Sequence, residues 1–253
     1  MSFILGLLDE GNANLSSAGG SFPFTLSAAM ADFANPASFA QFNRGLSARV
    51  ALYQGNRGDA LSRLGGSFMD MTGNMDLGPA RFYSTAGGDF ANNLFRPTNQ
   101  ADAIIAHPSF VADATEGDAR LSKVALRDAP LTLDGLTGSY DVVVFKSLND
   151  FVPLMRNEEL VLIAAEANIG SNNNAAVAAL NAVRNAAGIG DYTGATSDAA
   201  LTTELIYQRR YSLFGEGHRW VDMRRWNLLG DLPLDRDGDD VWVQFPIPVS
   251  ENQ

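Results

Sequence analysis

The stretch IYQRRYSLFGEGHRWVDMRRW, residues 206–226, mixes arginines and acids with aromatic side chains at helical spacing. Glycines on both sides of Glu216 interrupt it, so the stretch predicts two helices, about 199–214 and 218–227, joined by a bend. The planar guanidinium of arginine suits paired hydrogen bonds to carboxylates at a packed interface. We therefore expect the charges to form a lattice of ion pairs that locks these two helices together.

Two further pairs of helices are predicted upstream of this stretch. Apolar residues recur every three or four positions over 158–169 and again over 175–187, with a Gly-Ser-Asn-Asn turn between the two segments. A similar pattern covers 36–53 and 57–70, where Asn35 can cap the first helix and a proline follows it. Both pairs have about the size of a tetratricopeptide hairpin.

The remaining segments carry weak signals for regular structure. Residues from about 73 to 138 are rich in glycine, proline, asparagine and aromatic residues, which favours an irregular insert. Strand patterns are confined to 140–145 and 241–245, and Trp242 in the second is expected in the core. The expected fold class is mainly α, with tetratricopeptide-like helical hairpins, an irregular insert and a few short β-strands.

Composition excludes several classes of function. The 253 residues include 29 acidic and 18 basic side chains, a net charge of −11, which argues against nucleic acid as a partner. The absence of cysteine excludes disulfides, thiolate zinc sites and a cysteine nucleophile. No apolar run is long enough to cross a bilayer, and the first residues lack the features of a signal peptide.

No familiar catalytic or metal-binding motif is present. His107 and His218 are not spaced as zinc ligands, and His218 is expected to be a ring held by hydrogen bonds at a helix start. No cofactor is predicted. The acidic run at 235–240 lacks the glycine and glutamate positions of an EF-hand, so only adventitious Ca²⁺ at Asp235, Asp237 and Asp239 stays open.

Five stretches together resemble one family, the RagB/SusD-like outer-membrane nutrient-binding lipoproteins. They are MRNEELVLIAAEA at 155–167, LNAVRNAAG at 180–188, FGEGHRWVDMRRW at 214–226, FPIP at 245–248 and DARL at 118–121. The likeness is clear over about 118–253 and weaker over 1–70. Gln208 and Ser212 depart from the family, which commonly has glutamate there, and Ala119 replaces its proline.

The resemblance implies one partial SusD-like domain over 1–253, made of a helical hairpin at about 35–70, an insert at 73–138 and a helical core at 139–253. It also implies a cell-surface protein without catalytic activity, which hands glycans or other nutrients to a TonB-dependent, SusC-like transporter in the outer membrane. Members usually begin with a lipoprotein signal and a lipidated cysteine. Neither is in this sequence, so it resembles the C-terminal part of a longer protein or a shortened member.

The insert holds the predicted ligand contacts, since the recognisable motifs look like scaffold. Aromatic faces cover the C–H surface of sugars and amides bond their hydroxyls. The residues are Phe82, Tyr83, Phe90, Asn92, Asn93 and Phe95. The alternative is that these aromatic residues fill a neighbouring core. Two other functions also stay open, a helical adaptor for protein segments and, on the paired carboxylates, a glycan hydrolase.

Overall fold

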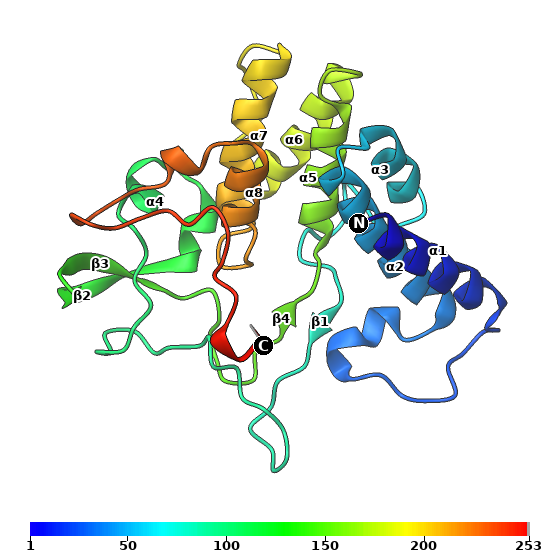
Figure 1. Cartoon of the computed structure of the whole chain (residues 1–253), viewed down its shortest axis with the longest axis horizontal. Coiled ribbons are helices and arrows are strands. Elements are labelled where there is room, and N and C mark those ends of the chain that lie inside the picture. Colours follow the sequence, from blue (N-terminus) through cyan, green and yellow to red (C-terminus); the bar gives the residue numbers. More distant parts are fainter. Residues whose placement is uncertain (252–253) are drawn as a thin grey trace.

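The computed structural model describes residues 1–251, and its regular structure is mostly helical (Figure 1). The α-helices are α1 Ser2–Ser17, α2 Pro36–Tyr53, α3 Arg57–Leu64, α4 Ser109–Ala112, α5 Asn157–Asn168, α6 Asn173–Ala186, α7 Asp198–Ser212 and α8 Arg219–Arg225. The strands are β1 Ala80–Arg81, β2 Val124–Leu133, β3 Leu136–Val142 and β4 Val152–Pro153. The expected class, mainly α with helical hairpins and a few short strands, is confirmed.

The predicted helices begin where the sequence offers a cap. The side chain of Asn35 accepts a hydrogen bond from the Ser38 amide at 3.0 Å at the start of α2. Asn56 does the same for α3 and Asn172 for α6. Only α3 differs clearly in length from its prediction, because two consecutive glycines after Leu64 end it well before residue 70.

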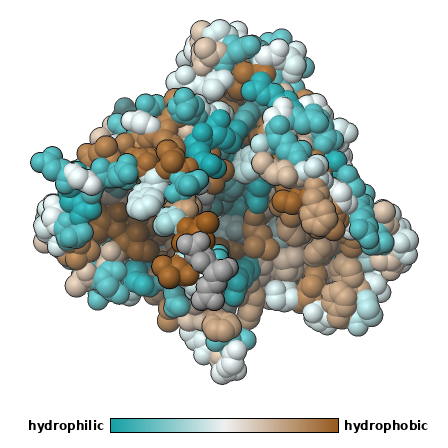
Figure 2. All heavy atoms as spheres, viewed as in Figure 1, coloured by the Kyte–Doolittle hydropathy of each residue, from teal (hydrophilic) through white to brown (hydrophobic). Residues whose placement is uncertain are grey.

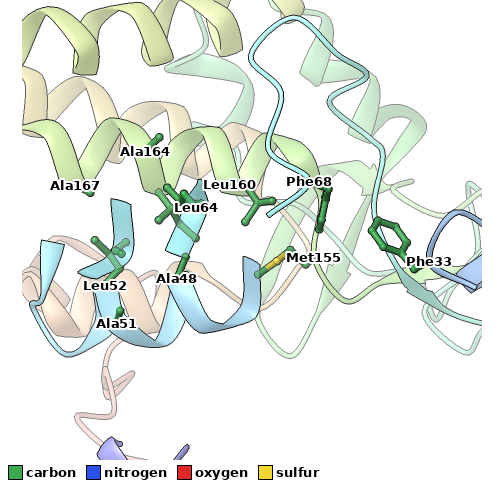
Figure 3. Close-up of a cluster of buried hydrophobic side chains, with 12 residues drawn as sticks. Phe33, Ala48, Ala51, Leu52, Leu64, Phe68, Met155, Leu160, Ala164 and Ala167 are labelled. Atoms are coloured by element: carbon green, nitrogen blue, oxygen red, sulfur yellow. The ribbon is translucent and has the colours of Figure 1, made fainter. Parts of the chain in front are cut away.

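Helix α5 lies at the centre of the helical part and contacts α2, α3, α6 and α7 (Figure 1). Of its 12 residues, 11 are buried, so it has apolar neighbours on opposite faces. One face, with Leu160 and Ile163, packs on α2 and α3 (Figure 3). The other, with Val161 and Leu162, packs on α6 and α7. The two hydrophobic clusters of the core therefore share one helix.

The predicted irregular insert contains regular structure. Strands β2 and β3 pair as an antiparallel hairpin, with a register shift between Leu126 and Leu131. Asp134 and Gly135 make the turn, both with positive φ. The expected strand at 140–145 is present only as far as Val142, and it begins earlier than expected, at Leu136. The short strands β1 and β4 also pair with each other.

Both ends of the chain differ from the prediction. The strand expected at 241–245 is wrong, since no partner segment pairs with these residues and they are irregular. Trp242 is 57% exposed and does not belong to the core. Helix α1 was not expected, because much of its apolar surface faces outward instead of forming a buried stripe.

Hydrophobic side chains gather in two areas of the face in Figure 2. One lies over the N-terminal helices, where Phe3, Ile4 and Leu7 of α1 are exposed. The other lies in a hollow between the β2–β3 hairpin and the C-terminal segment. Within the part of the chain that the structure describes, no helix is long and apolar enough to cross a membrane.

Candidate functional site

The predicted ion-pair lattice joins α7 and α8 through buried side chains. Arg209 Nε lies 2.7 Å from Asp222 Oδ2, and both side chains are almost completely buried. Arg225 donates to Asp222 at 2.9 Å and also pairs with Glu166 of α5. The lattice therefore extends one helix further than expected and holds α8 against the centre of the fold.

His218 lies at the edge of this lattice. Its Nδ1 is 3.4 Å from the Tyr53 hydroxyl, and its Nε2 is 3.8 Å from Glu159 of α5. Burial lowers the pKa of the imidazole, and the nearby Glu159 carboxylate only partly offsets this. Glu159 itself accepts a hydrogen bond from Arg49, so this neighbour of the ring already has a partner of its own. The arrangement fits the expected structural role of His218.

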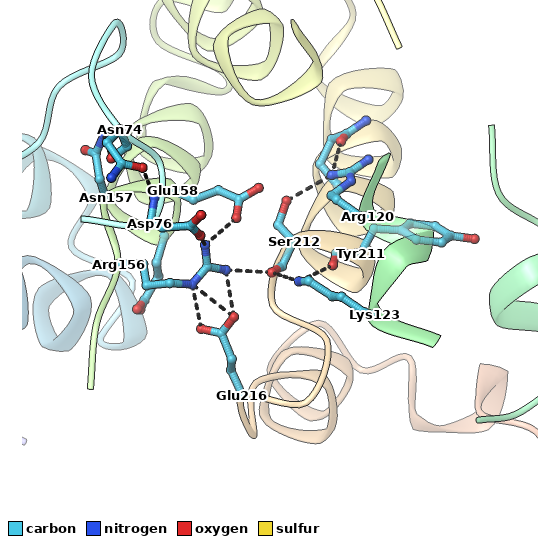
Figure 4. Close-up of polar contacts among 12 residues, drawn as sticks. Asn74, Asp76, Arg120, Lys123, Arg156, Asn157, Glu158, Tyr211, Ser212 and Glu216 are labelled. Atoms are coloured by element: carbon cyan, nitrogen blue, oxygen red, sulfur yellow. Dashed lines mark hydrogen bonds and ion pairs between the residues drawn. The ribbon is translucent and has the colours of Figure 1, made fainter. Parts of the chain in front are cut away.

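A second group of charges lines a cavity of about 630 Å³, which we call the charged cavity. Arg156 donates to Glu158 at 2.7 Å, to Glu216 at 2.6 Å and to Asp76 at 3.0 Å (Figure 4). Lys123 donates to the carbonyl of Tyr211 at the end of α7, and burial lowers its pKa to about 8. These groups satisfy one another, which is the behaviour of a scaffold.

Gln208 and Ser212, the two residues that stand in place of the family's glutamates, contact Arg120 of this cavity. The Nη1 atom of Arg120 donates to Gln208 Oε1 at 2.7 Å and to Ser212 Oγ at 2.9 Å (Figure 4). Arg120 already pairs with Asp118 through two of its other nitrogens. One carboxylate balances its charge, so neutral acceptors at 208 and 212 are sufficient. The α7–α8 lattice does not use either residue.

The predicted ligand residues in the insert do not line the cavities described here. Phe82 packs on Phe151 with ring centroids 5.4 Å apart, and Phe90 is 75% exposed. Asn92 is fully buried, and its amide donates to the Asp150 carbonyl, so it differs from a free ligand contact. The others stay near the surface: Tyr83 beside Arg81, Asn93 exposed and Phe95 half-buried.

The acidic run near the C-terminus makes internal contacts. Asp235 lies 3.0 Å from His107 Nε2, and Asp239 pairs with Arg236 at 2.8 Å. Asp237 is exposed. No cluster of three or more side chains suited to a metal ion occurs among residues 1–251. Adventitious calcium binding there stays a prediction.

A different cavity combines aromatic faces with free polar surface, and we call it the aromatic cavity. It has a volume of about 680 Å³ and lies between α4, the α7–α8 bend and the C-terminal segment. Its aromatic walls are Phe110, Phe214, Trp220 and Phe245. The rings of Trp220 and Phe245 are 4.6 Å apart, and Phe245 is 72% exposed.

Polar side chains stand around the same cavity. Arg210 donates to Asp113 at 2.9 Å and to Ser109 at 2.7 Å. The indole of Trp220 donates to the Trp242 carbonyl, which fixes the C-terminal segment against α8. Arg219 also lines the cavity. Aromatic surface with a few polar groups is the composition of sites that bind small polar ligands.

Sequence reasoning missed this cavity because its walls come from four separate segments, near 107–113, 210–220, 231–233 and 245. Trp220 and Phe214 stand in the motif that was expected to serve helix packing. Both residues are half-buried, with the ring of Phe214 against Phe110 and the ring of Trp220 against Phe245. One signal for this cavity was present in the sequence, the high number of aromatic residues in the motif at 214–226.

Comparison with known proteins gives one family match. Residues 145–245 match the model of the SusD family. No curated protein matches the chain.

Solved structures share the fold over much of this chain. Surface glycan-binding protein A from Bacteroides uniformis has a TM-score of 0.58 at 16% identity, over 88% of this chain and 57% of its own. A laminarin-binding SusD-like protein has a TM-score of 0.58 at 18% identity, over 98% of this chain and 67% of its own. A SusD superfamily protein from Parabacteroides distasonis has a TM-score of 0.56 at 17% identity, over 72% of this chain and 51% of its own. The chain thus spans about half to two thirds of the length of these proteins.

Proposed function

We propose that the chain, whose residues 145–245 match the SusD family, is a SusD/RagB-like protein that binds glycans and has no catalytic activity. The names of two proteins of similar fold, a surface glycan-binding protein and a laminarin-binding protein, support this class of ligand. We further propose that it acts at the surface of the outer membrane, held by a lipid anchor in the full-length protein, and passes its ligand to a TonB-dependent transporter.

The observation that carries the proposal is the aromatic cavity. The rings of Trp220 and Phe245 pack against each other, and Phe245, 72% exposed, still offers flat apolar surface of the kind that covers the C–H face of a sugar ring. Arg219 supplies donors without a partner among the described residues at the same cavity, where Arg210, Asp113 and Ser109 are hydrogen-bonded to one another. The charged cavity lacks this combination, since its guanidinium is already surrounded by three carboxylates. The loop at 82–95 stays a predicted second contact.

Isothermal titration against a panel of neutral and acidic oligosaccharides tests the proposal. Phe245→Ala is expected to weaken binding about five- to tenfold, the loss of one stacked aromatic face. Phe24→Ala is the control, because Phe24 is 60% exposed and does not line the aromatic cavity, while Phe90→Ala tests the insert loop. All three positions lie outside helices and strands, so none of the changes should affect folding.

The outcomes separate the sites and the classes of function. Loss of binding in Phe90→Ala but not in Phe245→Ala would move the ligand to the insert loop. If no oligosaccharide of the panel gives a heat of binding and the protein instead captures a defined protein segment, the adaptor function replaces glycan binding. Release of shortened sugars after long incubation would show a hydrolase.

A further inference from the structure

Arg219 differs from Arg209, Arg210 and Arg225, which each pair with a carboxylate, and from Arg224, which lies over the Trp220 ring. It is half-buried at the start of α8 and lines the aromatic cavity. Arg209 and Arg225, on the same pair of helices, each hold a carboxylate at hydrogen-bond distance. Within residues 1–251, no hydrogen bond and no ion pair engages the guanidinium of Arg219. Its donors are therefore available at the cavity wall.

The acids near Arg219 do not compensate it. Asp222 is committed to Arg209 and Arg225. Asp113 is committed to Arg210, and Asp231, which lines the same cavity and is exposed, makes no ion pair with Arg219, although its charge partly favours the guanidinium. Two guanidinium groups thus face one cavity while only one of them has a direct carboxylate partner.

This arrangement disfavours the charge on Arg219 when the cavity holds only solvent. Burial, and after it the positive charge of Arg210, lowers the pKa of the Arg219 guanidinium from its ordinary value. Arginine nevertheless stays protonated in proteins, so the group remains a cation with unused donors. An oxyanion in the cavity would supply the missing countercharge and accept two parallel hydrogen bonds.

Resting on the proposed glycan function, we infer that the aromatic cavity binds an acidic saccharide whose carboxylate or sulfate group pairs with Arg219. The sugar ring stacks on the exposed ring of Phe245, and the acidic group points to the guanidinium. The overall charge of −11 gives no long-range attraction for such a ligand. Recognition must therefore be local, at the cavity wall.

The test uses ligands that differ only in charge. Isothermal titration compares oligogalacturonate, its methyl ester and a sulfated neutral oligosaccharide with the unsulfated parent. For at least one of the two acids, carboxylate or sulfate, the wild-type protein is expected to bind the acidic ligand at least tenfold more tightly than its neutral counterpart. Arg219→Gln should lose about 10- to 100-fold in affinity for that acid, the effect of one charge-assisted pair, and keep the affinity for the neutral form.

Two more variants keep the result interpretable. Arg81→Gln removes the same charge from an exposed arginine that does not line the cavity, and should bind like the wild type. Arg219→Lys keeps the charge without the planar fork and should recover only part of the affinity. Circular dichroism confirms that each variant is folded.

The possible results distinguish this inference from the function on which it rests. Equal affinity for the acidic and neutral ligands, unchanged in Arg219→Gln, would overturn the acidic preference and leave glycan binding intact. An acidic preference that Arg81→Gln abolishes as strongly as Arg219→Gln would overturn the assignment to Arg219. No binding of any saccharide would overturn both proposals.

Discussion

Replacing Asp222 by asparagine removes the charge that balances Arg209 inside the helical core. Two nitrogens of Arg209 lie 2.7 and 3.1 Å from the carboxylate, and the two side chains are only 2% and 3% exposed. The remaining nitrogen, Nη1, has no partner among the described residues, so Asp222 is the only carboxylate in direct contact. Breaking a buried pair by removing one partner costs about 3–5 kcal/mol. We expect Asp222→Asn to lose that much free energy of unfolding.

Urea unfolding followed by circular dichroism measures the loss, with Asp76→Asn as the matched control. Asp76 lies 3.0 Å from Arg156, yet its side chain is 82% exposed. An exposed pair of this kind contributes about 1 kcal/mol or less. The same substitution should therefore cost several times less at residue 76 than at residue 222. If the two variants unfold at the same urea concentration, the buried pair does not stabilise α8 as argued.

Two further predictions concern burial and close packing. Because burial lowers the pKa of Lys123 to about 8, the unfolded chain binds more protons between pH 8 and 10.5, and stability should rise across that window by up to about 3 kcal/mol. Urea unfolding at pH 7.5 and 10.5 checks this, and an equal rise in Lys123→Met would contradict it. A Cβ on Gly78 would lie 1.9 Å from the Met155 carbonyl oxygen, so Gly78→Ala should lose about 1–3 kcal/mol. Gly58 on α3 faces open space, so the control Gly58→Ala should gain about 0.5–1 kcal/mol of unfolding free energy. Thermal unfolding compares the two variants, and equal melting temperatures would contradict the close approach at Gly78.

Local chemistry made most of the helices predictable. The cap of α2 at Asn35 and the apolar spacing of α5 are properties of a few neighbouring residues. Helix α1 was missed because Phe3, Ile4 and Leu7 do not face a core. The β2–β3 hairpin was missed although Asp134-Gly135 is a strong turn signal. The strand expected at 241–245 failed for the opposite reason, since a strand needs a partner that no local pattern supplies.

The candidate site was less predictable than the lattice beside it. A lattice of ion pairs between α7 and α8 could be predicted, because arginines and acids are interleaved on two adjoining helices, and the structure shows that Arg209 pairs with Asp222. The aromatic cavity instead brings Phe110 and Phe245 to the same wall from positions more than a hundred residues apart. Free donors such as those of Arg219 can be recognised only when every neighbouring acid has been assigned to another partner.

The burial of α5 on nearly all sides also bears on how the molecule comes apart. The helices before it and those after it each complete their hydrophobic cluster with a face of α5. Neither group can melt alone without exposing one side of that shared helix to water. Unfolding should therefore be cooperative across the helical part, and the amide protons of α5 should be the last to exchange with solvent.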